Sequence, residues 1–392
     1  MLTLKGPQYD IVSFARRHRE VTRPVLASRL GLSLPTVSLS VRSLIKDKLL
    51  LKEGLLESSG GRRAEILRIN PDFMDGIGLR VSMAGVIGVV ADLGGNVVAK
   101  SRLDWRGDPS KDDILNALYQ ATSELLKSGR RKPVGVGVGI TGLVSQADGV
   151  SLRFPYVEDW KDMPVRSLLE QRFNLPVSMD NDVKASTLAE LRFGEGRTAE
   201  NFLYVFVGKG IGLGIVLDGK VYHGASGNAG ELGHLAVKAD GSLCHCGNYG
   251  CLETLAGPPA IVHQVKEAIA RGASSSACPE PGAAVTIERV LAAAENGDRL
   301  AGNVVEKAAE HIGLALANMA NLLDPQMIVL GGLLSTAPKN LIDTIKRVFD
   351  SRVLPSIAPT VELKVSSLGD MSGALGAADM VFENHIRSLR TE

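Results

Sequence analysis

Two stretches of this chain share a dense alternation of glycine with valine and isoleucine, and this pattern restricts the fold more than any other feature. Residues 76–97 form the first stretch and residues 202–219 form the second. Short apolar runs broken by glycine-rich turns predict β-hairpins. A helix is expected after the first hairpin, over residues 111–127. Two such units in one chain predict an α/β protein with two related lobes around a cleft.

The rest of the body continues this mixture of buried strands and helices. We expect strands at 134–140, 177–179 and 327–330, and helices at 183–193, 304–323 and about 372–388. The 392 residues include 43 glycines and are 45% apolar, which is typical of a globular α/β protein. No apolar run approaches the roughly 20 residues that span a bilayer, and the N-terminus lacks a signal-peptide pattern. We therefore expect a soluble, cytoplasmic protein.

The first 70 residues are much more basic than the remainder. They contain thirteen Lys/Arg and six Asp/Glu, a net charge of +7, whereas the whole chain carries +1 and its remainder therefore −6. A compact basic segment on a mildly acidic body indicates an anionic partner for that segment alone. The alternative is a solvated basic surface.

This basic segment has the element order of a winged helix-turn-helix. The predicted elements are helices at 8–19 and 24–30, a turn at 31–33, a third helix with Pro35 in its first turn, and strands at 49–52 and 64–69. Thr22 is the expected cap of the second helix. The turn signal Asn70-Pro71-Asp72 predicts a boundary between a DNA-binding domain, residues 1–72, and a body, residues 73–392.

A winged helix places its third helix in the major groove of DNA and its wing against phosphates or the minor groove. The predicted DNA-contacting residues are Ser33, Thr36, Ser38 and Arg42 on the third helix, and Arg62 and Arg63 at the wing tip. The helix trio, the charge and the Gly-Gly-Arg-Arg wing together favour DNA binding. The alternative is a small protein-docking domain.

Three of the four cysteines, Cys244, Cys246 and Cys251, fall within eight residues, ten positions after His234. Thiolates and imidazole are the ligands that Zn²⁺ prefers, and reduced cytoplasmic thiols favour a metal over a disulfide. The cluster therefore predicts a zinc site, with a metal-free reduced cluster as the alternative. Glu231 and Glu253 bracket it, so groups able to bind a ligand lie close to the metal in sequence.

Two segments carry a family resemblance. Residues 208–235, with Gly-Lys-Gly-Ile-Gly-Leu-Gly and Gly-Glu-Leu-Gly-His-Leu, and residues 244–253, Cys-His-Cys-Gly-Asn-Tyr-Gly-Cys-Leu-Glu, are similar to the signature and zinc segments of the ROK family of repressors and kinases. The likeness covers the whole chain and extends to the NagC/XylR-type regulators of that family. It implies an N-terminal winged helix-turn-helix followed by a two-lobed actin-like, RNase H-like sugar-kinase domain.

The resemblance also implies roles for particular residues. In the kinases of the family, an Asp in an Asn-Asp pair is the general base, which corresponds to Asp182 in the pair Asn181-Asp182. The other sugar contacts correspond to Glu231, His234 and Glu253. The implied ligands of a closed, structural zinc site are His234, Cys244, Cys246 and Cys251, in a loop over residues 234–251. His245, between two of the cysteines, is the alternative histidine ligand.

The phosphate loops depart from the family. The first loop reads Asp-x-Gly-Gly-Thr-Lys in the kinases, whereas residues 80–85 here are Arg-Val-Ser-Met-Ala-Gly. Arg80 is a permanent cation without an acceptor atom, so it cannot coordinate Mg²⁺. In the second loop, Lys209 and Ile211 replace small or hydroxyl residues, and the remaining glycines need only shape a hairpin. Without organised Mg²⁺ and phosphate, efficient phosphoryl transfer is not expected, and Asp182 is left as an effector ligand.

The sugar-contact segment differs as well. Residues 154–160 place Tyr156 where the family has Asn, which indicates a different sugar, a modified sugar or no small effector. Tyr156 and Trp160 either contact the effector or only pack in the wall of the cleft.

These inferences predict a DNA-binding transcriptional regulator, most simply a repressor of carbohydrate uptake or catabolism genes controlled by a sugar or sugar derivative. Its expected partners are double-stranded operator DNA, the effector, and further copies of itself in a homodimer or homotetramer. The alternatives are an active ATP-dependent sugar kinase with a DNA-binding appendage, and a body that is regulated by a partner protein.

Overall fold

The computed structural model describes residues 2–55, 64–155, 157–280 and 282–391. Its residues form two compact units. The first unit combines residues 1–197 with 370–392, and the second comprises residues 198–369. The predicted domain boundary near residue 72 remains a prediction. Among the described residues, no helix combines the length and apolar character that crossing a membrane requires.

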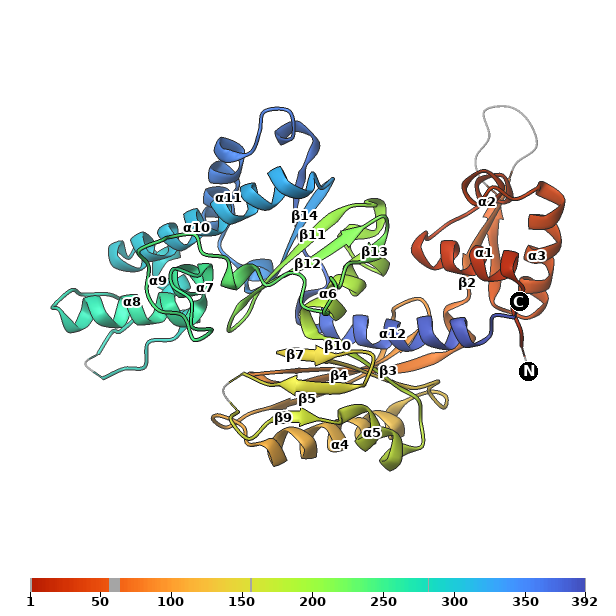
Figure 1. Ribbon diagram of the computed structural model, residues 1–392, viewed down its shortest axis with the longest axis horizontal. Coiled ribbons are helices and arrows are strands. Elements are labelled where there is room, and N and C mark those ends of the chain that lie inside the picture. Colours follow the sequence, from red (N-terminus) through yellow and green to blue (C-terminus); the bar gives the residue numbers. More distant parts are fainter. Residues whose placement is uncertain (1, 56–63, 156, 281, 392) are drawn as a thin grey trace. The chain divides into compact units, whose positions relative to one another are not determined.

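The winged helix belongs to the first unit, and its elements follow the predicted order (Figure 1). They are α1 Gly6–Arg17, α2 Arg23–Leu30, α3 Leu34–Lys46, and the antiparallel strands β1 Leu50–Leu55 and β2 Glu65–Ile69. Thr22 caps α2 as predicted, since its side chain accepts a hydrogen bond from the Val25 amide. Gly31 ends α2 in the left-handed region, with φ of 63°, which a glycine adopts without steric cost.

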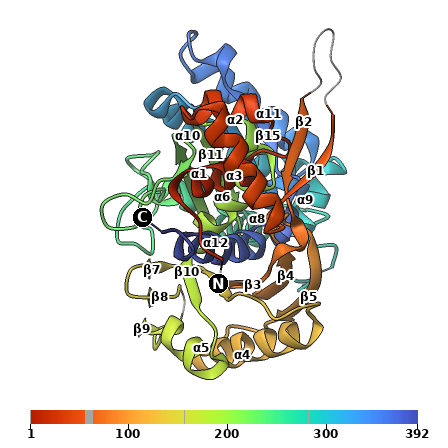
Figure 2. The same ribbon diagram turned by 90° about the vertical axis from the view of Figure 1, so that its right-hand side faces the viewer.

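The first unit also contains a five-stranded sheet in the order β10-β6-β3-β4-β5. Its strands are β3 Asp75–Ser82, β4 Gly85–Asp92, β5 Val97–Asp104, β6 Val136–Ile140 and β10 Val177–Asn181. Helix α4, Lys111–Ser128, lies on one face, and α12, Ser372–Ser388, lies on the other (Figure 1, Figure 2). The 3₁₀ turn η1, Pro71–Phe73, leads into this sheet. Strands β3 and β4 confirm the first predicted hairpin.

Helix α12 is packed at backbone distance against its neighbours. A Cβ on Gly137 of β6 would lie 1.8 Å from the carbonyl oxygen of Ala377. A Cβ on Gly376 would lie 1.7 Å from the carbonyl oxygen of Ala185, on helix α6, Asp182–Arg192. Neither position has room for a side chain. Helix α12 therefore packs directly against the sheet on one side and against α6 on another.

A smaller sheet, β7-β8-β9, was not predicted. Its strands are Leu143–Ser145, Val150–Arg153 and Lys161–Met163, and helix α5, Val165–Phe173, follows. Trp160 is 1% exposed, packs 5.8 Å from the ring of Phe154 and donates its indole N–H to Ser151. The packing alternative is therefore correct for Trp160. Tyr156 lies outside the described residues.

The second unit repeats the topology of the first sheet, in the order β13-β12-β11-β14-β15. In both sheets, a three-stranded antiparallel meander is extended by two parallel strands. The strands are β11 Phe202–Val207, β12 Ile211–Leu217, β13 Lys220–Val221, β14 Met327–Gly332 and β15 Glu362–Val365. The helices are α7 Leu252–Ala256, α8 Pro258–Ala270, α9 Ile287–Glu295, α10 Arg299–Leu323 and α11 Lys339–Arg352. The prediction of two related units is confirmed.

Candidate functional site

The cysteine cluster of the second unit forms a compact set of ligand atoms. His234, Cys244, Cys246 and Cys251 each offer one atom, and these atoms all lie within 4.8 Å of one another. Cys244 and Cys251 are buried, whereas Cys246 is exposed. The set is the one that the family resemblance implied.

Turn geometry brings these residues together. The Cys244 amide donates to the Asn248 carbonyl at 2.7 Å, and Gly247 has a left-handed φ of 91°. Gly250 is also left-handed, and a Cβ there would lie 1.6 Å from the carbonyl oxygen of Lys238. A tight turn and a close backbone contact thus hold the cysteine segment in shape before any metal is considered.

Two distances within the cluster match those of a tetrahedral zinc site. With Zn–S of about 2.3 Å and Zn–N of about 2.0 Å, a tetrahedron requires S···S of about 3.8 Å and S···N of about 3.5 Å. Cys246 Sγ lies 3.7 Å from Cys251 Sγ, and Cys244 Sγ lies 3.6 Å from His234 Nδ1. A separation of 3.7 Å excludes a disulfide, whose S–S length is about 2.05 Å.

The cysteine thiols differ in acidity. Burial raises the pKa of Cys251 to about 12 and also raises that of Cys244. A hydrogen bond from the Asn248 backbone lowers the pKa of Cys246. Three neighbouring thiolates repel one another, so a cation is needed to hold all three deprotonated together.

The second histidine has a different partner. His245 Nδ1 lies 3.5 Å from Glu253 Oε1 and 3.8 Å from Cys244 Sγ. Glu253 Oε2 accepts the Ile211 amide at 3.1 Å, and a Cβ on Gly210 would lie 2.3 Å from that oxygen. The backbone of the glycine-rich turn after β11 is therefore in direct contact with the Glu253 carboxylate. Glu231 is exposed just before the 3₁₀ turn η3, Leu232–His234.

The predicted pair Asn181-Asp182 lies in the first unit, where strand β10 runs into α6. Asn181 caps α6, because its side-chain oxygen accepts from the amides of Val183 and Lys184 at 2.9 and 3.3 Å. Its side-chain amide also donates to the Gly142 carbonyl at 3.1 Å. Three bonds within the protein make Asn181 a positioning residue for the neighbouring carboxylate.

Asp182 is 3% exposed and has two partners that the sequence did not reveal. Its Oδ2 accepts from Thr141 Oγ1 at 2.8 Å and lies 3.4 Å from a guanidinium nitrogen of Arg80. Arg80 thus forms an ion pair with the carboxylate that corresponds to the general base of the family kinases. Both partners contact the same carboxylate oxygen, which an incoming hydroxyl would have to share with them. Sequence reasoning had identified Arg80 only as a departure from the phosphate loop.

The loop after Arg80 is shaped by packing within the protein. Ser82 pairs with Gly85 across a hairpin turn of two residues, Met83 and Ala84. Met83 is 6% exposed and belongs to the hydrophobic core of the sheet. A buried methionine thus occupies a loop position at which the family kinases have glycine. This local geometry supports the expectation that the loop does not cradle phosphate.

On the winged helix, α3 presents a mixed surface. Ser33 and Arg42 are exposed, whereas Thr36 and Ser38 are partly buried. Ser33 also caps α3, since its hydroxyl accepts from the Thr36 amide at 3.2 Å. Leu39, which was not predicted, is 65% exposed on the same helix and is a further candidate for contact with base edges. Arg62 and Arg63 lie outside the described residues.

Several cations of this basic region have partners within the protein. Glu65 on β2 accepts from Lys52 and Arg23, and these bonds lower its pKa. Arg68 lies 3.0 Å from Glu53. The net charge of the segment therefore overstates the number of cations available to an anionic partner.

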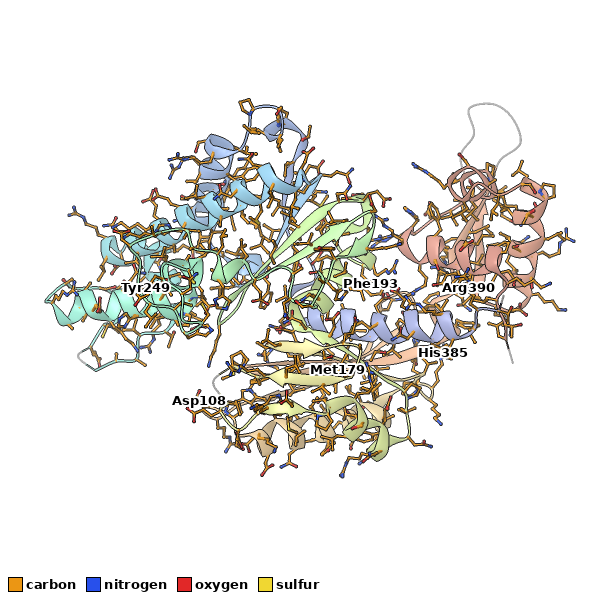
Figure 3. All side chains as sticks on the ribbon, viewed as in Figure 1. Asp108, Met179, Phe193, Tyr249, His385 and Arg390 are labelled. Carbon is orange, nitrogen blue, oxygen red and sulfur yellow. The ribbon has the colours of Figure 1, made fainter. Side chains whose placement is uncertain are left out.

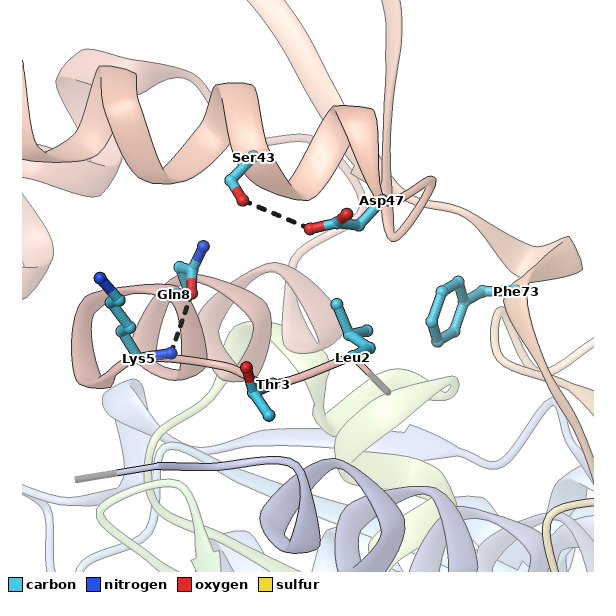
Figure 4. Close-up of a pocket in the computed structure, with 7 residues that line it drawn as sticks. All are labelled: Leu2, Thr3, Lys5, Gln8, Ser43, Asp47 and Phe73. Atoms are coloured by element: carbon cyan, nitrogen blue, oxygen red, sulfur yellow. Dashed lines mark hydrogen bonds between the residues drawn. The ribbon is translucent and has the colours of Figure 1, made fainter.

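A separate pocket of about 530 Å³ lies within the first unit (Figure 4). It is lined by Leu2, Thr3, Lys5, Gln8, Ser43, Asp47 and Phe73. Hydrogen bonds from the Lys5 amide to Gln8 and from Ser43 to Asp47 fix its polar walls. None of the predicted effector residues lines this pocket.

The comparison with known families decides the identity of the body. Residues 77–384 match the sequence model of the ROK family. The chain belongs to the ROK family. The similarity of this chain to individual members extends beyond residues 77–384 and includes the winged helix.

Among ROK proteins, the chain is 29% identical to a xylose repressor of Caldicellulosiruptor bescii, over 93% of this chain and 92% of that protein. It is 31% identical to the DNA-binding transcriptional dual regulator NagC of Escherichia coli K12, over 92% of this chain and 88% of NagC. A glucokinase of Halalkalibacterium halodurans is 35% identical, but over only 69% of this chain and 82% of the kinase.

A solved structure gives the same result. The crystal structure of a ROK family transcriptional regulator, a homologue of the E. coli MLC protein, matches with a TM-score of 0.79 and 28% identity. The match covers 97% of this chain and 98% of that protein. The winged helix and the two-lobed, actin-like body therefore occur together in a known regulator, and the predicted fold is confirmed.

Proposed function

We propose that this protein is a sequence-specific, DNA-binding transcriptional regulator, a repressor of carbohydrate uptake or catabolism genes. One observation carries the proposal: the chain joins a winged helix to a ROK body, and relatives aligned over 92–93% of its length are named as repressors or regulators. The ROK kinase relative aligns over a smaller part of the chain.

We further propose that a sugar or sugar derivative controls DNA binding. The proposed effector ligands are Asn181, Asp182, Glu231, His234 and Glu253. Carboxylates accept hydrogen bonds from sugar hydroxyls. Asn181 acts mainly through the backbone that it holds, because its amide is already bonded within the protein. The effector would have to compete with Arg80 and Thr141 for the Asp182 carboxylate.

Phosphoryl transfer is not part of the proposed function. Arg80 and Thr141 already occupy an oxygen of the Asp182 carboxylate, and the buried Met83 supports the loss of the first phosphate loop. Because the chain is also similar to a glucokinase, sugar kinase activity is the alternative to test. Sugar-dependent release of ADP from ATP that disappears in Asp182→Asn would establish it.

The proposed cofactor is one structural zinc ion per chain, held by His234, Cys244, Cys246 and Cys251. Four protein ligands would close the site and leave no position for a reactive water. The zinc would fix the segment that carries His234 and Glu253. The protein would act as a homodimer or homotetramer in the cytoplasm, with paired winged helices on a pseudo-palindromic operator.

A mobility-shift assay on the DNA upstream of the gene, titrated with salt, tests the proposal. We expect a sequence-specific shift that weakens with salt and changes when D-xylose, N-acetyl-D-glucosamine or D-glucose is added. The absence of any specific shift at low salt would contradict DNA regulation. A specific shift that none of the sugars alters would contradict sugar control.

A further inference from the structure

Four charged side chains from three helices meet inside the first unit. Arg16 of α1 donates to Asp379 Oδ1 of α12 at 2.5 Å, and Arg192 of α6 donates to Asp379 Oδ2 at 3.3 Å. Arg192 also donates to Glu383 Oε2 at 3.2 Å. We name these residues, Arg16, Arg192, Asp379 and Glu383, the charge quartet. Arg16 and Asp379 are 363 positions apart, so the contact joins the DNA-binding region to the last helix of the chain.

The centre of the quartet, the Arg16–Asp379 pair, is buried, and the quartet holds two cations and two anions. The side chains of Arg16 and Asp379 are 4% and 1% exposed. Burial opposes ionisation of Glu383, but the charges of Arg192 and Arg16 outweigh it, and the pKa of Glu383 is lowered. Burial likewise opposes the charge of Arg192, but Asp379 and Glu383 outweigh it and raise the pKa of Arg192. The two arginines therefore keep Glu383 ionised despite its burial.

A second set of contacts attaches the winged helix to the end of α12. The Leu4 amide donates to the Leu389 carbonyl at 2.7 Å, and the Thr391 amide donates back to the Leu4 carbonyl at 2.8 Å. The guanidinium of Arg390 lies 5.0 Å from the centre of the Tyr9 ring. Figure 3 shows Arg390 just beyond the end of α12, beside the winged helix. The DNA-binding region is thus joined to α12 at two separate places.

The opposite ends of the same helices lie at Asp182, one of the proposed effector residues, and at its partner Arg80. Helix α6 starts at Asp182 and ends at Arg192, and its ten steps span about 15 Å. Helix α12 starts at Ser372, and a Cβ on Gly373 would lie 2.4 Å from Cδ of Arg80. Arg80 is the residue paired with Asp182. A ligand that displaces Arg80 from Asp182 would therefore act on the first turns of both helices.

Close packing lets the two helices move together. Gly376 brings the backbones of α12 and α6 into contact at Ala185, so a shift of one helix cannot be absorbed by side-chain rearrangement between them. The quartet lies one to two turns further along α12. At its centre, the buried Arg16–Asp379 hydrogen bond has no access to bulk water that could replace a lost partner, so the quartet tolerates little relative movement.

The geometry points to the charge quartet as the coupling element between effector binding and DNA binding. Effector bound at Asp182 shifts α6 and α12 as a pair, and Arg16 passes that shift to α1 and hence to the DNA-binding face of the winged helix. This inference rests on the proposed function. It assigns Arg16, Asp379 and Arg192 as positioning residues that contact neither effector nor DNA.

The test compares Arg16→Gln with a matched control, Arg387→Gln, in the full-length protein. Arg387 is 64% exposed on α12, and its ion pair, with Glu383, stays within that helix. Three constants are measured for each protein: the affinity for the upstream DNA without sugar, the affinity for that DNA with sugar, and the affinity for the sugar alone. The sugar is the one of D-xylose, N-acetyl-D-glucosamine and D-glucose that changes DNA binding of the wild type most.

We expect Arg16→Gln to bind the sugar as tightly as the wild type, within about twofold, while the sugar-induced change in DNA affinity falls at least tenfold, within the usual range of allosteric coupling. Arg387→Gln should keep the full response. Arg16→Lys, which keeps the charge, should recover part of it. A merely structural role for Arg16 would lower the melting temperature and leave the ratio of DNA affinities unchanged, and that result overturns the inference.

Hydrogen exchange of the wild type decides the question if Arg16→Gln does not fold. Sugar should change exchange in α6, in the second half of α12 and in α1, and an unchanged α1 would refute the coupling. If none of the three sugars alters DNA binding of the wild type, sugar control itself fails and the coupling falls with it. If the sugar acts on the wild type and on Arg16→Gln alike, only the coupling is refuted.

Discussion

Replacement of Cys251 by serine should remove the proposed zinc ion and abolish the proposed response to effector. Cys251 is fully buried and belongs to the four-ligand set. Serine has nearly the same shape, but its hydroxyl does not ionise near neutral pH and is a poor ligand for zinc. Cys278, half-buried and outside the cluster, offers the matched control Cys278→Ser, which makes the same atomic change without touching the ligand set.

The expected loss of affinity can be estimated from the ligand set. Structural zinc sites in small peptides bind the ion with an apparent free energy of about 10–16 kcal/mol at neutral pH. If this is divided evenly over four ligands, one thiolate contributes about 2.5–4 kcal/mol. The affinity for zinc should therefore fall by about 10²- to 10³-fold in Cys251→Ser.

The loss should extend to the effector residues because Cys251 and Glu253 are neighbours in one segment. Cys251 occupies the position just before α7, and Glu253 lies in the first turn of that helix. Loss of the metal frees the segment, so Glu253 and His234 lose their fixed positions. The winged helix contributes no ligand to the cluster and should keep its fold.

Three measurements check this prediction. Zinc content per chain is measured after purification, zinc affinity by competition with a chelator, and sugar binding by thermal shift. The wild type and Cys278→Ser should hold one zinc ion and respond to sugar, whereas Cys251→Ser should do neither. Cys251→Ser that retained one tightly bound zinc ion would refute the assigned ligand set. A full sugar response in zinc-free protein would refute the supporting role of the metal.

Three further outcomes follow from packing, surface charge and titration. Gly376→Ala should lower the free energy of unfolding in denaturant by about 1–3 kcal/mol, because its Cβ would meet the Ala185 carbonyl. Gly302→Ala, at an open helical position of α10, should instead be neutral or stabilising, and equal effects would disprove the packing argument. Arg42→Gln should weaken DNA binding and reduce the slope of log affinity against log salt by about 1, if Arg42 neutralises one phosphate. Since the pKa of Glu383 is lowered in the folded state, its charge stabilises the fold above its unfolded pKa, and this contribution is lost as pH falls through the folded pKa. Thermal melts of Glu383→Gln should therefore depend less on pH in the acid range than those of the wild type, and parallel curves would contradict this.

Much of the secondary structure was predictable because its signals are local. The caps at Thr22 and Gly31 mark the ends of α2, and the last helix was predicted at 372–388, as observed. The small sheet β7-β8-β9 was missed because strands of three or four residues are too short to show a period. Among the candidate site residues, the His/Cys cluster was the most predictable, since three of its four residues lie within eight positions.

The sequence by itself determined the winged helix, the repeated α/β units and the cysteine spacing, because caps, alternation and ligand spacing act over a few residues. Tertiary structure decided which partners the isolated charges have. It placed Arg80 against Asp182, His245 beside Glu253, and Arg16 against Asp379. Such pairs leave no periodic trace in the sequence, because the attraction depends on distance and burial in the folded chain and not on separation along it.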